Sequence, residues 1–219
     1  MLNGGLKAHY GLLTKEQRTR ISLMSGKDSA GRPLKGHSHS YFFIYPDEHG
    51  QPYRLIVWRR SVPFNELEVE ALRFVASKPM PWAGGLVYLV PLPVGTPLPQ
   101  NLAGPARGWS SATPFVPARS RHRFRAGKIR PGETTERLAE RLLADLGFPV
   151  PRCLTSRSVE SVRLHQTRRA RLASAAAKPV FGMAYNLDIE FTEPVEGPIL
   201  IGDSSHFGLG LLCTVEDTF

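Results

Sequence analysis

The chain has 219 residues, of which 42% are hydrophobic, and a formal net charge of +9. This composition predicts a folded protein with a sizeable core and excludes a largely disordered chain. No run of about 18 apolar residues occurs, and residues 1–11 lack the apolar stretch of a signal peptide, so we expect no membrane partner. The two cysteines, Cys153 and Cys213, are isolated and far apart, which favours a reducing cytoplasm over a disulfide framework.

A first group of predicted elements occupies residues 1–92. A weakly patterned strand over residues 6–13 precedes a helix, which should begin with the capping box "TKEQ" at Thr14 and end at Gly26. Two β-rich runs follow at residues 38–46 and 53–60, then a helix over 65–77 and a strand over 84–92. The order strand, helix, strand, strand, helix, strand is that of a ferredoxin-like domain.

A second group is predicted over residues 109–219, after a linker rich in proline and glycine at residues 93–108. It comprises a strand over 109–116, a helix from a threonine cap to Gly147, and a hairpin of residues 159–166 and 181–193. Two short strands around a glycine-rich turn close the chain at residues 197–215. The predicted fold class is therefore α+β, with two tandem ferredoxin-like domains and a C-terminal glycine-rich loop.

The basic charge is concentrated in two segments of the second half. Residues 107–130 contain seven basic residues and no acid, and residues 152–178 contain seven basic residues and one acid. Arginine dominates both segments, and its planar guanidinium matches phosphate geometry better than a merely solubilising charge would require. A solvated basic surface is the plain alternative, but the distribution favours a polyanionic partner, above all nucleic acid.

The glycine-rich turn places Gly202, Gly208 and Gly210 around His206. Glycines let backbone N–H groups approach an anion closely, although a tight hairpin would have a similar sequence. This loop, after two ferredoxin-like halves with a basic hairpin in the second, resembles the RAMP superfamily of CRISPR proteins. Four stretches carry a closer resemblance: "SGKDSAGRPLKGHSHSYFFIYPDE", "WSSATPFVPARSRHRF", "EPVEGPILIG" and "SSHFGLGLL".

In order and spacing, these stretches are similar to the C-terminal, Cas-six-like half of the subtype I-G (formerly I-U) fusion of Cas-five-like and Cas-six-like parts. They cover residues 25–213, nearly the whole chain. The Cas-five-like half has no counterpart in this sequence, so we expect a stand-alone version or a separately made fragment.

The resemblance implies an endoribonuclease that binds the stem-loop of CRISPR repeat RNA and cuts it at its base. Enzymes of this group generally act without a metal ion or other cofactor: the 2′-hydroxyl next to the scissile phosphate attacks, which leaves a 2′,3′-cyclic phosphate. Such chemistry needs a base, an acid and positive charge near the phosphorane. The resemblance also implies that the protein stays bound to the mature RNA together with other Cascade subunits.

Three histidines are the candidate catalytic residues: His37, His39 and His206. His37 and His39 alternate just before a predicted strand, so they should lie on the same face, and histidine can serve as either base or acid near neutral pH. We favour His37 as the base because it follows the flexible Gly36. The plain alternative is that one of these two histidines only packs against Tyr41 or forms a hydrogen bond within its own loop.

A metal ion shared by the two neighbouring histidines is a further alternative. Zinc would need about two more protein ligands. Only Asp47, Glu48 and His49 lie nearby in the sequence, so we predict no metal site.

The predicted RNA contacts are basic residues and glycines. Arg119, Arg121, Arg123 and Arg125 alternate, so an extended segment would present them in one row to successive phosphates. Residues 168–171 lie on the predicted hairpin connection, where arginine suits the backbone of a duplex stem. The complete set is Lys35, Arg107, Arg119, Arg121, Arg123, Arg125, Lys128, Arg130, Arg168, Arg169, Arg171, Gly202, Gly208 and Gly210.

Two other functions were weighed against the endoribonuclease. A RAMP subunit that binds the repeat RNA without cutting it would have the same fold and the same basic segments. A two-histidine phosphoesterase would need two separated His-x-Ser/Thr motifs; "HSHSY" supplies none in register, and no partner motif follows.

Overall fold

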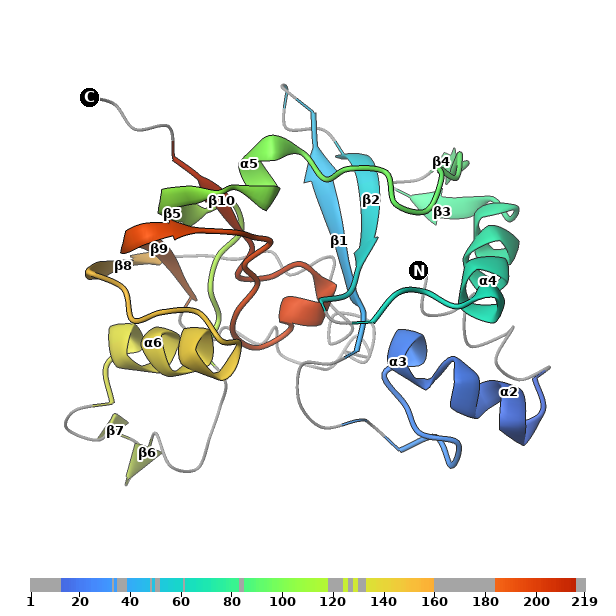
Figure 1. Cartoon of the computed structure of the whole chain (residues 1–219), viewed down its shortest axis with the longest axis horizontal. Helices are drawn as coiled ribbons and strands as arrows, with labels where there is room; N and C mark the ends of the chain where they lie inside the picture. Colours follow the sequence, from blue (N-terminus) through green and yellow to red (C-terminus); the bar gives the residue numbers. More distant parts are fainter. Residues whose placement is uncertain are drawn as a thin grey trace. The chain divides into compact units, whose positions relative to one another are not determined.

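The computed structural model describes residues 13–32, 34, 39–47, 49, 52–60, 62–82, 85–117, 124–125, 128–129, 133–159 and 184–215. The described chain is α+β (Figure 1). It divides into two compact units: unit 1 comprises Met1–Ser40 and Val57–Pro97, and unit 2 comprises Tyr41–Ile56 and Leu98–Phe219. This division differs from the expected domains of residues 1–92 and 109–219, because the first predicted hairpin belongs to the same unit as the C-terminal half.

A four-stranded antiparallel sheet forms the centre of unit 2. Its strands follow the order β10 (Leu212–Thr214), β5 (Ala106–Ser111), β9 (Ala184–Val195) and β8 (Cys153–Val159). Alternation along β9 buries Leu187, Ile189 and Phe191 on one face, while Asp188 and Glu190 lie on the other. The buried face is the core of the unit.

Helix α6 (Thr135–Asp145) covers this core face (Figure 1). It begins after Thr134, whose side chain accepts a hydrogen bond from the Arg137 amide, and Gly147 follows its end with a φ of +80°. Ala139 and Leu143, four residues apart and hence on one side of the helix, are both fully buried. The start and end of this helix are confirmed as predicted.

Trp109 of β5 is fully buried in the same core. Its indole lies between two glycines that are far apart in the chain. A Cβ atom at Gly104 would lie 3.1 Å from Trp109 Cζ2, and one at Gly197 would lie 2.6 Å from Trp109 Cη2. The second distance is below any real Cβ contact, so the indole fits only because Gly197 carries no side chain.

The segment expected as a linker folds within unit 2. Helix α5 (Gln100–Ala103) buries Leu102, and β5 begins three residues after it. Proline and glycine here shape a short helix and a turn rather than a free connection. The reading of residues 93–108 as a linker between two domains therefore differs from the structure at residues 98–108.

The hairpin strands β1 (Tyr41–Pro46) and β2 (Pro52–Trp58) form a two-stranded sheet, as the two β-rich runs predicted. Alternation in β1 buries Tyr41 and Phe43. Strand β1 packs against the 3₁₀ helix η1 (Ser205–Phe207) in the glycine-rich loop. Tyr45 Oη also donates a hydrogen bond of 3.0 Å to Asn101 Oδ1, which ties β1 to α5.

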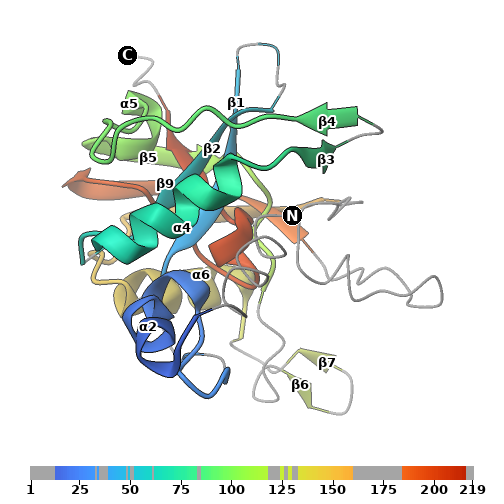
Figure 2. The ribbon, with the colours of Figure 1, turned by 90° about the vertical axis from the view of Figure 1, so that its right-hand side faces the viewer.

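Unit 1 contains the helices α2 (Lys15–Arg20), α3 (Ser22–Ser25) and α4 (Glu66–Ala76) and the paired strands β3 (Met80–Trp82) and β4 (Gly85–Val87), which lie side by side in Figure 2. The predicted capping box at Thr14 is present, and the helix that it starts is interrupted at Ile21 and ends at Gly26 in the left-handed conformation. Helix α4 also has a capping box, in which Asn65 and Glu68 bond each other's backbone amides.

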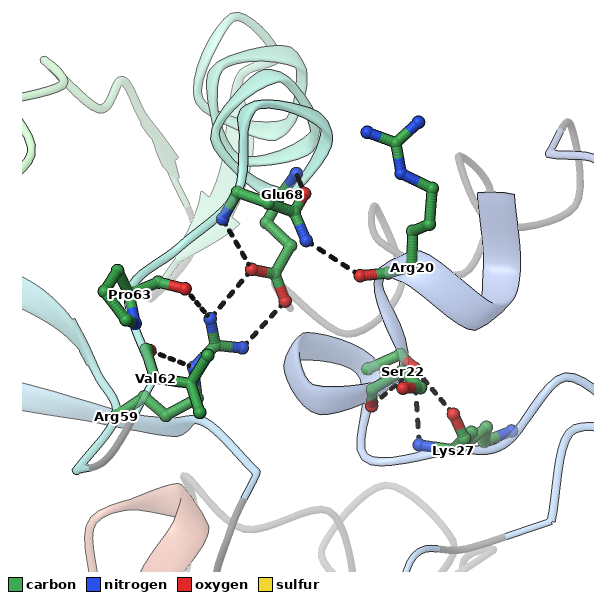
Figure 3. A network of polar contacts seen from close by, with 9 residues as sticks. Arg20, Ser22, Lys27, Arg59, Val62, Pro63 and Glu68 are labelled. Carbon is green, nitrogen blue, oxygen red and sulfur yellow. Dashed lines mark hydrogen bonds and ion pairs between the residues drawn. The ribbon is translucent and has the colours of Figure 1, made fainter. Parts of the chain in front are cut away.

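A buried ion pair connects the start of α4 to the end of β2 (Figure 3). The Arg59 guanidinium donates two hydrogen bonds of 2.8 Å to the Glu68 carboxylate and two more to the carbonyls of Val62 and Pro63. The side chains of Arg59 and Glu68 are only 2% and 1% exposed. Because nearly all of their polar atoms are bonded, both charges are tolerated inside unit 1.

Several predicted strands differ in the structure. The partner of β9 is Cys153–Val159, earlier in the chain than the predicted residues 159–166. Among the described residues, β1 and β2 form one sheet and β3 and β4 another, not a single four-stranded sheet. The predicted strand at residues 6–12 and the hairpin connection at residues 167–180 lie outside the described residues. Two tandem ferredoxin-like domains remain a prediction.

The buried ion pair yields a stability prediction. Glu68→Gln should lower the free energy of unfolding by about 3–5 kcal/mol, because the Arg59 charge would stay buried without its counter-ion. Arg32→Gln is the matched control in unit 1, since it removes an ion pair with Asp28 in which the Arg32 side chain is 80% exposed. Urea unfolding followed by circular dichroism measures both. Equal, small effects of the two substitutions would contradict a stabilising role for the buried pair.

Candidate functional site

Most of the predicted RNA contacts lie outside the described residues. These are Lys35, Arg119, Arg121, Arg123, Arg130, Arg168, Arg169 and Arg171, together with the favoured base His37. Arg125 and Lys128 lie on the short strands β6 (Phe124–Arg125) and β7 (Lys128–Ile129), where they are paired in an antiparallel register. Besides these two strands, the described part of the candidate site consists of the glycine-rich loop, His39, His206 and Arg107.

The glycine-rich loop is packed tightly inside unit 2. Gly208 and Gly210 have φ angles of +89° and +62°, which side chains rarely allow. A Cβ atom at Gly208 would lie 2.9 Å from Phe43 Cβ, and one at Gly210 would lie 1.9 Å from the Ile201 carbonyl oxygen. At Gly202 it would lie 2.7 Å from the Phe115 ring. Close packing by the protein itself thus requires glycine at these positions.

The amides of two of these glycines donate within the protein. The Gly208 amide donates to the Ser205 carbonyl at 3.0 Å, and the Gly210 amide donates to the Pro114 carbonyl at 2.9 Å. In this conformation neither amide is directed at an anion, so the turn geometry accounts for Gly208 and Gly210 without a phosphate. The RNA-binding role of Gly202, Gly208 and Gly210 remains a prediction.

Thr113, just after β5, forms two hydrogen bonds to the glycine-rich loop. Its hydroxyl donates to the Gly208 carbonyl at 2.7 Å and accepts from the Leu211 amide at 2.9 Å. One side chain thereby bonds both ends of the segment that follows η1. Together with the Phe43 contact at Gly208, this holds η1 in one place on β1.

His206 lies on η1 and stacks on Tyr41 of β1. The two ring centroids are 4.0 Å apart, and the ring planes are inclined by 25°. His206 is partly exposed, but its Nε2 atom is buried. In this conformation, Nε2 of this imidazole is therefore closed to direct contact with a substrate.

His39 belongs to unit 1 and is also partly exposed. Its ring lies against the end of α3, since a Cβ atom at Gly26 would be 3.2 Å from His39 Cδ2. Its Nδ1 atom is buried, so this nitrogen is closed to direct contact with a substrate in this conformation. In both His39 and His206, one ring nitrogen is enclosed by the protein while the residue as a whole keeps some solvent access.

The polar face of the main sheet carries arginines that are paired with acids. Arg157 donates to Asp188 at 3.1 Å and Arg152 to Glu190 at 3.2 Å, and both acids lie on β9. The predicted RNA contact Arg107 lies 3.8 Å from Glu193 and is exposed. The positive charge at the start of the second basic segment is thus largely matched by carboxylates of the same sheet.

Two residues of the site, Tyr41 and Thr113, were not identified from the sequence. The sequence suggests Tyr41 only as a packing partner of His37 or His39, not of His206, and Thr113 lies 95 residues before the glycine whose carbonyl it bonds. Neither has a local pattern that marks such a contact, because both act across long stretches of chain.

Among the described residues, no group of three or more histidine, cysteine, aspartate or glutamate side chains could hold a metal ion. Burial raises the pKa of the Cys213 thiol, which disfavours its thiolate. None of the helices in the described ranges has the length and apolar character that a bilayer crossing requires. Comparisons with models of protein families, with curated proteins and with solved structures found no match.

The packing of the glycine-rich loop can be tested with two alanine substitutions. Gly147→Ala should cost about 1–2 kcal/mol, because only its positive φ is strained and the space around it is open. Gly210→Ala should cost clearly more, since the new methyl group would overlap the Ile201 carbonyl. Thermal unfolding of both variants measures the difference. Equal losses would mean that the loop relaxes freely around residue 210.

Proposed function

We propose that this chain is an endoribonuclease of CRISPR RNA maturation, which binds the repeat stem-loop of the precursor and cleaves it without a metal ion. The four ordered stretches that resemble the Cas-six-like family support this proposal, as does the concentration of arginine in residues 107–130. The proposal includes two tandem ferredoxin-like domains, a cytoplasmic location, and continued association with the mature RNA and other Cascade subunits.

The structural observation that carries the proposal is the way His206 is held. A general acid or base must keep one orientation while presenting a single ring nitrogen to the substrate. The geometry of His206 supports the first requirement, because its ring stacks on Tyr41 and its Nε2 is enclosed by the protein. His39, with a buried Nδ1, is similarly placed within unit 1.

The proposed reaction needs only two proton transfers and a displacement at phosphorus. A base, His37 or His39, removes the proton of the 2′-hydroxyl, whose oxygen forms a bond to the adjacent phosphorus. The bond from phosphorus to the 5′-oxygen breaks, and an acid protonates that oxygen; the candidates for this acid are the other histidine of the His37 and His39 pair and, as the rival, His206. The products are a 2′,3′-cyclic phosphate and a 5′-hydroxyl, and nearby guanidinium groups stabilise the charge of the phosphorane.

Cleavage of a labelled repeat hairpin in excess chelator tests this function. His37→Ala, His39→Ala and His206→Ala should each be assayed, and loss of a catalytic acid or base should slow cleavage by about 10²–10⁴-fold. Binding of the hairpin should persist in each variant. His49→Ala is the control, since His49 is exposed and lies in the turn between β1 and β2.

The nature of the product decides between the alternatives. A 2′,3′-cyclic phosphate on the upstream fragment supports the proposed reaction. A requirement for Mg²⁺, or a 3′-hydroxyl end, would contradict it. Binding of the hairpin without any product would instead identify a RAMP subunit that has no catalytic activity.

The basic segment gives a separate prediction about RNA affinity. Neutralising Arg121, Arg123 and Arg125 together should weaken binding and flatten its salt dependence by about one unit of slope for each lost phosphate contact. The control is the double variant Arg152→Gln/Arg157→Gln, whose guanidinium groups already face Glu190 and Asp188. Binding measured between about 50 and 300 mM salt, over which the Debye length changes about 2.4-fold, shows the slope. An unchanged slope in the triple variant would place these arginines away from the RNA.

A further inference from the structure

Tyr41 stacks on the His206 ring although the two residues are far apart in the sequence. Tyr41 is 2% exposed and lies at the start of β1, so its own ring is fixed by the packing of that strand. The neighbouring Phe43, on the same face of β1, abuts Gly208 at the other end of η1. Strand β1 therefore supports both the backbone and the imidazole of this loop.

The geometry points to Tyr41 as a positioning residue for His206, an inference that rests on the proposed function. The Tyr41 ring stacks on the imidazole, 4.0 Å away, and keeps it in the orientation in which Nε2 is buried. Tyr41 itself needs no contact with the substrate for this role.

The backbone around His206 is too constrained to place the ring elsewhere by itself. The Thr113 hydroxyl bonds the Gly208 carbonyl and the Leu211 amide, and Ser204 before η1 has a φ of +63°. With the backbone held, the remaining freedom of His206 is the rotation of its side chain. A flat aromatic surface 4.0 Å from the imidazole centroid restricts that rotation, and offset stacked rings attract each other beyond their area of contact.

Two variants of Tyr41 distinguish the effect of its flat ring on catalysis from the effect of a buried apolar side chain. Tyr41→Phe keeps the stacked ring and should retain kcat within about twofold. Tyr41→Leu keeps an apolar side chain but loses the ring, so kcat for hairpin cleavage should fall by about 10²-fold, the scale expected when a catalytic group is misplaced by about 1 Å. KM should change little, because Tyr41 makes no contact with RNA in this role.

Phe43→Leu is the matched control for the loss of a buried ring. It removes an equally buried aromatic side chain from the same face of β1, but from Gly208 rather than from His206. It should lower the melting temperature about as much as Tyr41→Leu while kcat falls far less. Equal losses of kcat in the two leucine variants would overturn the inference in favour of a general packing effect.

A double variant tests whether Tyr41 acts through His206. If it does, Tyr41→Leu/His206→Ala should cleave no more slowly than His206→Ala alone, since the ring would have nothing left to position. Additive losses, or a loss in Tyr41→Phe as large as in Tyr41→Leu, would overturn the inference.

A spectroscopic measurement keeps this inference separate from the proposed function. In NMR spectra of the wild-type chain and of Tyr41→Phe, the ring protons of His206 should be shifted upfield by the stacked ring, and this shift should disappear in Tyr41→Leu. If no variant cleaves RNA but this pattern is observed, the proposed function fails and the positioning by Tyr41 stands. If the shift survives in Tyr41→Leu, the positioning role is wrong whatever the activity.

Discussion

The packing of strand β1 against the glycine-rich loop is the contact on which the described part of the candidate site in unit 2 depends. Tyr41 stacks on His206, and Phe43 lies so close to Gly208 that no side chain fits there. Thr113 holds the same loop through two hydrogen bonds from the direction of the sheet. A loop held from two sides keeps its imidazole in one orientation, which is what proton transfer to a bound substrate requires. The hairpin of β1 and β2, from the first half of the chain, is thus a structural part of unit 2.

The helices were predictable because their signals are local. Thr14, Asn65 and Thr134 each accept a hydrogen bond from a backbone amide within three residues, and such caps can be read directly from the sequence. The strand that pairs with β9 was placed too late in the chain, because β8 has only one apolar residue, Leu154, that packs against the core. A strand with so little apolar alternation gives no periodic signal. Helix α5 was missed for a similar reason, since a four-residue helix with Leu102 as its only buried residue resembles a loop in sequence.

The candidate site was predicted only in part. The sequence predicts His39, His206 and the glycines as site residues. It does not show whether a glycine is needed because a phosphate binds there or because another part of the protein packs closely against it. The φ angles and inward-directed amides of Gly208 and Gly210 favour the second explanation in this conformation. Counting charges along the sequence also fails to show which arginines are available to a partner. Arg152 and Arg157 belong to a basic segment, yet each forms an ion pair with a carboxylate on β9. The folded sheet determines which arginines have a carboxylate beside them, and the sequence alone does not show this.

The packing of Trp109 between Gly104 and Gly197 limits which substitutions this fold can accept during evolution. Both glycines face the same indole, so neither can acquire a side chain while the tryptophan remains. A smaller residue at position 109 would not remove that restriction, because a Cβ atom at Gly197 would also overlap the Leu102 carbonyl oxygen and one at Gly104 would lie 2.9 Å from the Val195 carbonyl oxygen. In descendants of this sequence, both glycines should consequently persist even where position 109 changes.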